Sequence, residues 1–327
     1  MRLLILNRHA VRELLPMRTC MDTLADAFQA YSSGESVQPL RTMMKVPPGE
    51  DILASMPGYD GASQALAVKL ITVFHGASEA GFDSHQGLVV LFSAEHGNPL
   101  AIMDAIEITA IRTAAASGVA TKLLAREDAS KLAIIGAGVQ ARTHFDAMLE
   151  ARSFESARIW NRSQDRAESL VKELSRKDRA DLTVAETVED AVASADVICT
   201  VTATLEPILK GEWLKSGTHI NAVGSSTPNK RELDTEAVVK SRIFTDSRES
   251  ALNEAGDFLI AKSEGAVEDN HILGEIGDIL NGKVSGREQS DEITMFKSLG
   301  MAVEDVAAAH LIYELAKAES KGVWVEM

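Results

Sequence analysis

Three basic side chains stand in apolar or extended segments of the chain, where a charge is unexpected. Lys69 interrupts the apolar segment 67–71, Arg112 interrupts the apolar helical segment 108–114, and Arg41 lies in an extended segment. Charged groups are rarely buried unless they are paired. In a chain this acidic, such interruptions indicate a pocket for a carboxylate. A lysine on a half-exposed strand is more often simply solvated, so the spacing alone leaves both interpretations open.

A glycine-rich turn follows the apolar segment 132–135 and opens a helical pattern. The order is G-x-G-x-x-A: Gly136 permits a tight turn, Gly138 lets the backbone approach a pyrophosphate, and Ala141 keeps helix and strand close. The free N–H groups at the start of that helix attract phosphate. This strand–turn–helix predicts a dinucleotide site. Its expected contacts are Gly136, Gly138, Val139, Gln140 and Ala141.

The end of the second strand bears on the choice of dinucleotide. Sites that prefer NAD usually place an acid there, which accepts a hydrogen bond from the ribose 2′-hydroxyl. This chain has Asn161 and Arg162 instead, and Asp165 lies further on, where we expect the first turn of the next helix. An arginine can bind a 2′-phosphate, although Arg162 could also be a solvated surface residue. We therefore expect NADP(H) to be preferred and NAD(H) to be possible. The further cofactor contacts that we expect are Asn161, Arg162, Ser163, Thr200 and Val223.

The elements that must position these residues fall into two patterns. The N-terminal third begins with a strand at 2–6 and two helices, the second over 21–31 and stopped at 32–34. Extended segments bounded by proline and glycine follow, so we expect a mostly antiparallel sheet. Its expected strands are 40–46, 52–56 and 65–74, with a hairpin formed by 87–92 and 100–103. A helix rich in small residues over 105–124 then leads into the second domain.

From Lys131 the pattern changes to short buried strands that alternate with helices, which is typical of a doubly wound parallel sheet. The expected strands are 131–135, 157–160, 182–185, 197–201, 219–223 and 243–245, and the expected helices include 164–174 and 188–193. A last amphipathic helix over 303–317 is expected to return to the first domain. The fold class is therefore α/β: a Rossmann-type domain over 119–300 and an α+β substrate and dimerisation domain formed by 1–118 with 301–327.

Composition narrows the partners and the compartment. The 327 residues carry a formal net charge of −15, which disfavours nucleic acid and anionic membranes as partners. The two cysteines, Cys20 and Cys199, form neither a metal cluster nor a disulfide framework and are expected to be buried thiols. No secretory signal is visible and no segment approaches the roughly 18 apolar residues of a membrane helix. We expect a cytoplasmic protein without a metal.

These residues carry a resemblance to a known family. Over nearly its whole length the chain resembles the ornithine cyclodeaminase/mu-crystallin family, and most closely its ketimine reductase and Δ1-pyrroline-2-carboxylate reductase members. The resemblance implies homodimers with a Rossmann domain inserted into the substrate domain. It also implies that Arg41, Lys69 and Arg112 bind the substrate carboxylate. The segments that carry it are 68–70, 83–87, 111–115, 136–141, 159–162, 218–224 and 296–305.

Two absent carboxylates separate the chemistries within this family. The cyclodeaminase branch has an aspartate where this chain has Ser226, and a glutamate where it has Ala54. Ornithine needs an acid to hold its δ-ammonium group and a base for its attack. The resemblance therefore favours NAD(P)H-dependent reduction of a cyclic imino acid, Δ1-pyrroline-2-carboxylate or Δ1-piperideine-2-carboxylate, to L-proline or L-pipecolate.

In this reaction Arg41 and Arg112 are expected to hold the carboxylate, and Lys69 to supply a proton or positive field at the imine nitrogen. His85 and Ser226 are further candidates, as substrate contacts or proton-relay groups. Three alternatives stay open at this point. They are ornithine cyclodeamination, an amino-acid dehydrogenase of the alanine dehydrogenase type, and a nucleotide-dependent binding protein without turnover.

Overall fold

The computed structural model describes residues 2–49, 51–177 and 179–326. It divides into two compact units. Unit 1 is formed by Met1–Arg112 and Gly300–Met327, and unit 2 by Thr113–Leu299. The first boundary lies inside the long helix α3 (Ala105–Leu124). The C-terminal segment of the chain therefore completes the first unit.

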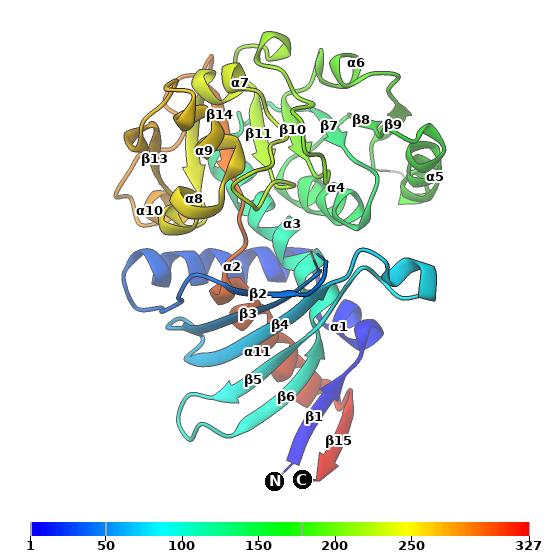
Figure 1. Cartoon of the computed structure of the whole chain (residues 1–327), viewed down its shortest axis with the longest axis vertical. Helices are drawn as coiled ribbons and strands as arrows, with labels where there is room; N and C mark the ends of the chain where they lie inside the picture. Colours follow the sequence, from blue (N-terminus) through cyan, green and yellow to red (C-terminus); the bar gives the residue numbers. More distant parts are fainter. Residues whose placement is uncertain (1, 50, 178, 327) are drawn as a thin grey trace. The chain divides into compact units, whose positions relative to one another are not determined.

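Unit 1 contains a seven-stranded sheet in the order β15-β1-β6-β5-β4-β3-β2 (Figure 1). Only the β1–β6 pair is parallel, and every other pair is antiparallel, as the sequence predicted. The strands are β1 (Arg2–Leu6), β2 (Thr42–Val46), β3 (Asp51–Asp60), β4 (Ala65–Val73), β5 (His85–Ser93), β6 (Pro99–Asp104) and β15 (Val323–Glu326). The helical elements are α1 (Arg8–Leu14), α2 (Met17–Ser32), the short η1 (Ala77–Ala80) and α11 (Ala302–Glu319).

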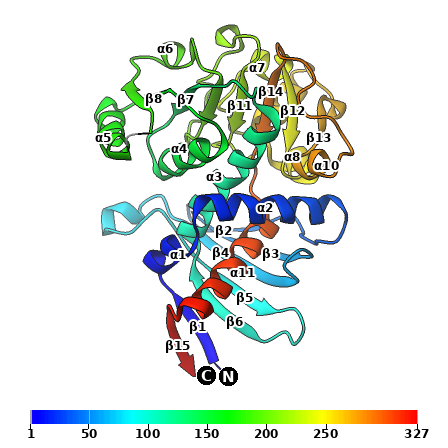
Figure 2. The same cartoon turned by 180° about the vertical axis from the view of Figure 1, so that it is seen from behind.

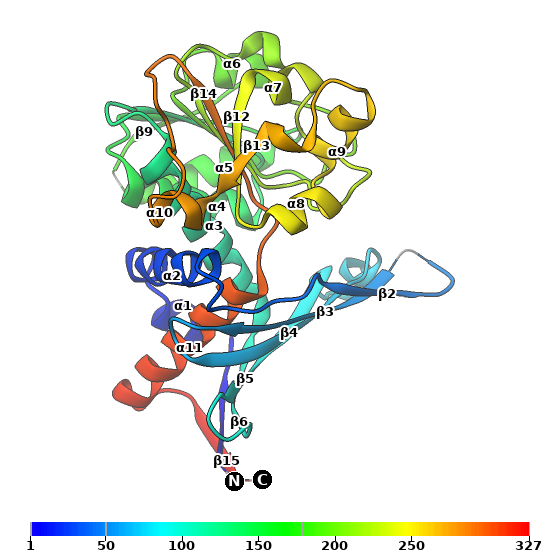
Figure 3. The same cartoon turned by 90° about the vertical axis from the view of Figure 1, so that its left-hand side faces the viewer.

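Helix α11 covers one face of this sheet (Figures 2 and 3). It packs against β3, β4 and β5 and against helix α2. Because side chains alternate along a strand, Ala67 and Lys69 of β4 and Val89 and Leu91 of β5 point to this covered face and are buried. The C-terminal helix thus closes the core of the first unit, as predicted.

Unit 2 contains an eight-stranded sheet in the order β13-β12-β14-β11-β10-β7-β8-β9, and all its pairs are parallel (Figure 1). The chain order reverses between β7 and β10, as in a doubly wound dinucleotide-binding fold. The strands are β7 (Lys131–Ile135), β8 (Ser156–Trp160), β9 (Asp181–Val184), β10 (Val197–Thr200), β11 (His219–Ala222), β12 (Ser241–Thr245), β13 (Ile272–Glu275) and β14 (Ile293–Lys297).

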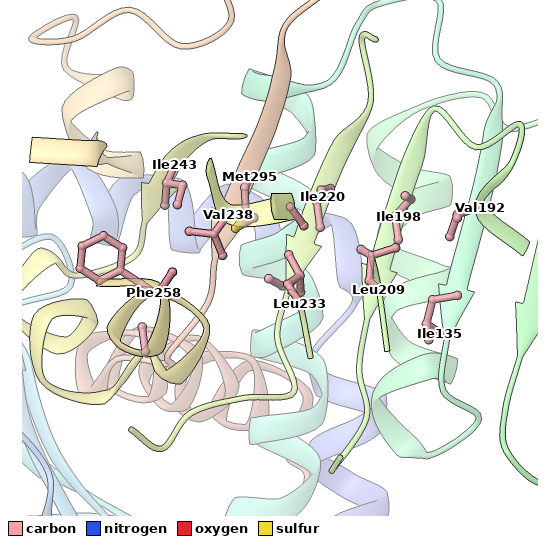
Figure 4. Close-up of a cluster of buried hydrophobic side chains, with 14 of the residues drawn as sticks. Ile135, Val192, Ile198, Leu209, Ile220, Leu233, Val238, Ile243, Phe258 and Met295 are labelled. Atoms are coloured by element: carbon pink, nitrogen blue, oxygen red, sulfur yellow. The ribbon is translucent and has the colours of Figure 1, made fainter. Parts of the chain in front are cut away.

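Helices flank the central strands, so strands such as β7 and β10 are buried on both faces. One cluster of buried apolar side chains includes Ile135, Ile198, Ile220, Ile243 and Phe258 (Figure 4). The helices are α4 (Val139–Ala151), α5 (Gln164–Leu174), α6 (Val188–Val192), α7 (Thr235–Lys240), α8 (Arg248–Glu254), α9 (Gly256–Ser263) and α10 (Ile276–Leu280). Short 3-10 turns are η2 (Ser175–Lys177), η3 (Gly211–Trp213) and η4 (Asp269–His271).

The predicted α/β fold class is confirmed, but one strand was predicted too short and three strands were missed. Strand β3 continues through Gly58 to Asp60, because its ladder with β4 extends to the Asp60–Ala65 pair, whereas the sequence placed a turn at 58–61. The strands β13, β14 and β15 were missed, and in the central strand β14 the polar residues Thr294 and Lys297 break the apolar pattern. Both cysteines are buried free thiols, as expected. None of the described helices is long and apolar enough to span a membrane.

Candidate functional site

Lys69 and Arg112 lie buried in unit 1 and share one carboxylate. The Lys69 Nζ lies 2.7 Å from Asp305 Oδ2, and the Arg112 Nε donates to Asp305 Oδ1 at 3.0 Å. The Arg112 Nη1 also donates to Glu304 Oε2 at 2.7 Å. All four of these side chains are almost fully buried. The predicted interruptions of β4 and α3 are therefore paired charges rather than solvated ones.

The N-terminus of α11 supplies both carboxylates. Glu304 and Asp305 lie in the first turn of this helix, where the helix dipole favours negative charge. The preceding loop approaches closely: Gly300 has φ +79°, and a Cβ there would lie 2.5 Å from Arg112 Nη1. The Arg41 Nη2 donates to the Gly300 carbonyl at 3.0 Å. Arg41 is thereby tied to the loop that borders the Arg112 guanidinium.

The charge cluster formed by Arg41, Lys69, Arg112, Glu304 and Asp305 perturbs its own members. Burial and the Arg112 charge lower the pKa of Lys69 to about 8, although Asp305 acts in the opposite direction. Burial also opposes the charged form of Arg112, but Asp305 and Glu304 together raise its pKa above the usual value. Three cations and two carboxylates leave one net positive charge. The cluster is therefore suited electrostatically to one monoanionic group.

The structure brings Arg41, Lys69 and Arg112 together but does not place His85 with them. His85 begins β5 and pairs with Val73, whereas Lys69 pairs with Val89, four residues further along β5. At about 3.3 Å per residue this separation is roughly 13 Å. The His85 Nδ1 lies 3.1 Å from Ser84 Oγ, and burial lowers the pKa of His85. No described contact links His85 to the charge cluster.

The glycine-rich turn of unit 2 has the form that a dinucleotide requires. Gly136 has φ +129°, and a Cβ there would lie 2.9 Å from the Val201 carbonyl oxygen, which follows β10. A Cβ on Gly138 would meet nothing within 4 Å, so the space beside this residue is open. Gly138 is the N-cap of α4 and no side chain caps this helix, while Ala141 is fully buried against the sheet. The residues present therefore fit a pyrophosphate at the N-terminus of α4.

The other predicted cofactor contacts lie at the carboxyl ends of neighbouring strands. Asn161 and Arg162 follow β8, and Arg162 is exposed and forms no ion pair with any described residue. Asp165 lies in the first turn of α5, as predicted. Thr200 ends β10 and is buried. The remaining positions are Val139 and Gln140 in the first turn of α4, Ser163 as the N-cap of α5, and Val223 in the loop after β11. Ser226, which was predicted as a substrate contact or proton-relay group, lies in the same loop of unit 2.

A family model described as the ornithine cyclodeaminase/mu-crystallin family matches residues 1–320. The chain belongs to the ornithine cyclodeaminase/mu-crystallin family. The resemblance inferred from segments such as 136–141 and 296–305 is therefore confirmed.

Individual members of the ornithine cyclodeaminase/mu-crystallin family are similar over most of the chain. The ketimine reductase mu-crystallin of Mus musculus is 43% identical over 287 residues, which is 88% of each chain. The solved Thermococcus litoralis Δ1-pyrroline-2-carboxylate reductase, in complex with NADH and L-proline, has a TM-score of 0.95 and 39% identity. The aligned region covers 98% of this chain and 99% of the Thermococcus litoralis chain. An archaeal alanine dehydrogenase dimer with bound NAD has a TM-score of 0.94 and 32% identity over 100% of both chains.

Sequence reasoning missed the two acidic members of the charge cluster. Glu304 and Asp305 were noticed only as part of a family segment, and no site role was given to them. The signal that identified Lys69 and Arg112 applies equally here, because Glu304 and Asp305 interrupt an apolar helix between Val303 and Val306. Charges of opposite sign in several apolar segments of one domain predict that they pair with one another.

Asp305→Asn is expected to lower the free energy of unfolding by about 3–5 kcal/mol, because it leaves Lys69 and Arg112 buried without their shared carboxylate. The matched control is Glu314→Gln, on the same helix, whose pair with Lys317 is solvent-exposed. That variant should lose less than about 1 kcal/mol. Urea unfolding of the two variants measures the difference. Equal losses would contradict a structural role for the buried carboxylate.

Proposed function

We propose that this chain is an NAD(P)H-dependent reductase of cyclic imino acids, which converts Δ1-pyrroline-2-carboxylate or Δ1-piperideine-2-carboxylate to L-proline or L-pipecolate. The observation that carries the proposal is the charge cluster, in which Lys69 and Arg112 meet beside Arg41 with one net positive charge. The Thermococcus litoralis relative, whose solved complex holds NADH and L-proline, supports it.

Arg41 and Arg112 are assigned to the substrate carboxylate. Arg112 uses Nε and Nη1 for its carboxylate partners, and no described residue accepts a hydrogen bond from its Nη2. Arg41 is only partly buried and is tethered by Gly300. Two guanidinium groups that are already oriented lower the entropic cost of fixing the substrate. The geometry of the carboxylate would then fix the orientation of the ring.

Lys69 is assigned to the proton at the imine nitrogen. Its ammonium group has three N–H donors, and the contact with Asp305 uses one of them. A pKa of about 8 makes it a better acid near neutral pH than an ordinary lysine. When the nitrogen of a C=N group is protonated, its carbon accepts hydride more readily. The cluster therefore serves two ends of one small substrate, its carboxylate and its nitrogen.

A nicotinamide dinucleotide fits unit 2 at the turn from Gly136 to Gly138 and at the start of α4. Bound there, it supplies the hydride for the imine carbon. The chain's own part is to present uncapped N–H groups of α4 to the pyrophosphate and to keep the space beside Gly138 open.

The test is an assay of NADH and NADPH oxidation with the two cyclic imines, with pyruvate plus ammonia, and with ornithine. We expect turnover with a cyclic imine, and Lys69→Ala should lower kcat at least 100-fold while the dinucleotide still binds. Turnover confined to pyruvate plus ammonia would replace the proposal with an alanine dehydrogenase, which the archaeal relative makes the second candidate. Dinucleotide binding without any turnover would leave a binding protein.

In the same assay, the rate of imine reduction should decrease with pH on the alkaline side of neutrality. Lys69 must be protonated to act as an acid, and its protonated fraction falls tenfold per pH unit above its pKa of about 8. The rate should therefore be level below pH 8 and decrease above it, provided that the imine concentration is kept saturating. A rate that rises through pH 8 to 10 would show that Lys69 acts as a base or not at all.

We infer that NADP(H) is preferred over NAD(H). Arg162 is exposed just after β8, where a 2′-phosphate would lie. The position before it, where sites that prefer NAD usually have an acid, is Asn161. The two solved relatives hold NADH and NAD, so both dinucleotides belong in the comparison. The preference rests on the charge of this one side chain.

Arg162→Glu is expected to weaken NADPH binding at least tenfold relative to NADH, because it exchanges attraction for repulsion at the 2′-phosphate. Arg176→Glu makes the same change of charge at an exposed position of η2 and should leave the ratio unaltered. Dissociation constants from dinucleotide fluorescence give the ratio. An unchanged ratio in Arg162→Glu would disprove the assignment.

We also infer that the chain forms a homodimer through the uncovered face of the unit 1 sheet. Leu70 of β4 and Leu88 of β5 pair directly on this face, and both are exposed, as are Leu53 and Met44 further along it. An apolar sheet face without a covering layer is typical of a protein interface. The archaeal alanine dehydrogenase relative is itself a dimer. A second copy of this chain is therefore the expected occupant.

Leu88→Glu is expected to convert the dimer to monomers, because it places a charge at the centre of that face. Val239→Glu, at an exposed apolar position of α7 in unit 2, is the control and should stay dimeric. Sedimentation equilibrium measures both masses. A Leu88→Glu variant that remains dimeric would move the interface elsewhere.

A further inference from the structure

Glu232 in unit 2 is a buried carboxylate to which the reaction assigns no role. Its side chain is fully buried and accepts four hydrogen bonds. Its Oε1 accepts from the backbone N–H of Thr202 at 2.6 Å and from the Thr202 hydroxyl at 2.7 Å. Its Oε2 accepts from the Gly224 N–H at 2.7 Å and from the Thr200 hydroxyl at 2.8 Å. A single carboxylate thus joins the segments that leave β10 and β11.

The backbone of Glu232 is itself held on both sides. Its N–H and that of Leu233 donate to Asp257 Oδ1 at 2.7 and 3.0 Å, and the other Asp257 oxygen accepts from Lys297 Nζ at 2.8 Å. The Glu232 carbonyl accepts from Ile208 and Leu209. Burial and the nearby Asp257 raise the pKa of Glu232. Because its carboxylate and its backbone are both hydrogen-bonded, Glu232 is held rigidly in this buried position.

The two joined segments lie where the second half of a dinucleotide is expected. A doubly wound fold consists of two mononucleotide-binding halves, with the ligand outside the carboxyl ends of the strands. The β7–β8–β9 half carries Gly136 and Arg162, which suit the pyrophosphate and the adenosine ribose. The segments after β10 and β11 belong to the other half. These segments are therefore expected to bind the nicotinamide nucleotide.

We propose that Glu232 is a positioning residue. It fixes the segments after β10 and β11 in the conformation that binds the nicotinamide half of the dinucleotide. This inference rests on the proposed dinucleotide binding and assigns one half of that ligand to one buried side chain. Glu232 acts through Thr200, Thr202 and Gly224 rather than by touching the reacting atoms. Thr200 is the last residue of β10, and Thr202 and Gly224 each lie two residues beyond a strand end.

The test compares an intact dinucleotide with its adenosine half. Glu232→Gln keeps the size of the side chain but replaces one accepting oxygen with a donor, so one set of N–H and O–H partners loses its acceptor. We expect NADPH or NADH, whichever binds more tightly, to bind at least tenfold more weakly. The fragment that lacks the nicotinamide nucleotide, 2′,5′-ADP or AMP respectively, should keep its affinity within twofold. A general loss of structure would weaken both ligands alike.

Asp196→Asn is the matched control. Asp196 is also a buried carboxylate that accepts backbone N–H groups, those of Ser130 and Lys131, but it lies at the amino ends of β7 and β10 and also pairs with Arg126 and Lys215. Its substitution should leave both affinities within twofold, even where stability falls. If Glu232→Gln does not fold, Thr202→Val removes one hydroxyl donor to Glu232 and keeps the buried charge, and about a threefold loss confined to the intact dinucleotide is expected.

The outcomes separate the inference from the function on which it rests. A selective loss for the intact dinucleotide supports the positioning role. Equal losses for the dinucleotide and its fragment, an unchanged affinity, or the same selective loss in Asp196→Asn would overturn it while dinucleotide binding stands. A wild-type chain that binds neither NADH nor NADPH would instead overturn the proposed function.

Discussion

The charge cluster of unit 1 depends on Asp305, because one buried carboxylate is shared by two buried cations. An isolated ammonium group inside a protein would lose its charge, whereas a guanidinium group stays protonated and would draw in water. With Asp305 in place, Lys69 can stand on the covered face of β4 and Arg112 can stand within α3. Because Asp305 belongs to α11, the last helix must return to the first unit before the cations can be buried. The fold and the site therefore share one constraint.

The two units use buried carboxylates for different purposes. In unit 1, Glu304 and Asp305 receive cations, so the cluster keeps enough positive charge for one further anion. In unit 2, the hydrogen bonds that Glu232 accepts come from neutral N–H and O–H donors, and Lys297, whose charge acts on Glu232, is paired with Asp257 instead. The first arrangement sets the charge of a site, whereas the second fixes the shape of backbone segments. Neither is replaceable by an apolar residue of similar volume, because each would leave several polar groups without partners.

Local signals explain which parts of this molecule the sequence predicts. The bounds of α3, α5 and β7 follow from runs of apolar or helical residues, and the turn at Gly136 follows from glycine chemistry at fixed spacing. Pairing over long separations is different. Arg112 and Asp305 are 193 residues apart, so the acids that interrupt the apolar pattern of α11 can be noticed in the sequence, but no local signal shows which cations they pair with. The strand β14 was not predicted for a related reason. Its buried Lys297 is accounted for only by its pair with Asp257, which belongs to helix α9.

The position of Ala54 links the charge of the cluster to the choice of reaction. Ala54 lies on the covered face of β3, two residues from Met56, which pairs directly with Lys69. A glutamate at this position, as the cyclodeaminase branch has, would stand diagonally across from Lys69 on the same face. It would cancel the one remaining positive charge and would offer an acceptor for a second ammonium group. With alanine there, the cluster keeps its net charge of +1 and presents an apolar wall. A cyclic imino acid, which has one carboxylate and no second ammonium group, suits this site, whereas the δ-ammonium group of ornithine would find no acceptor at Ala54.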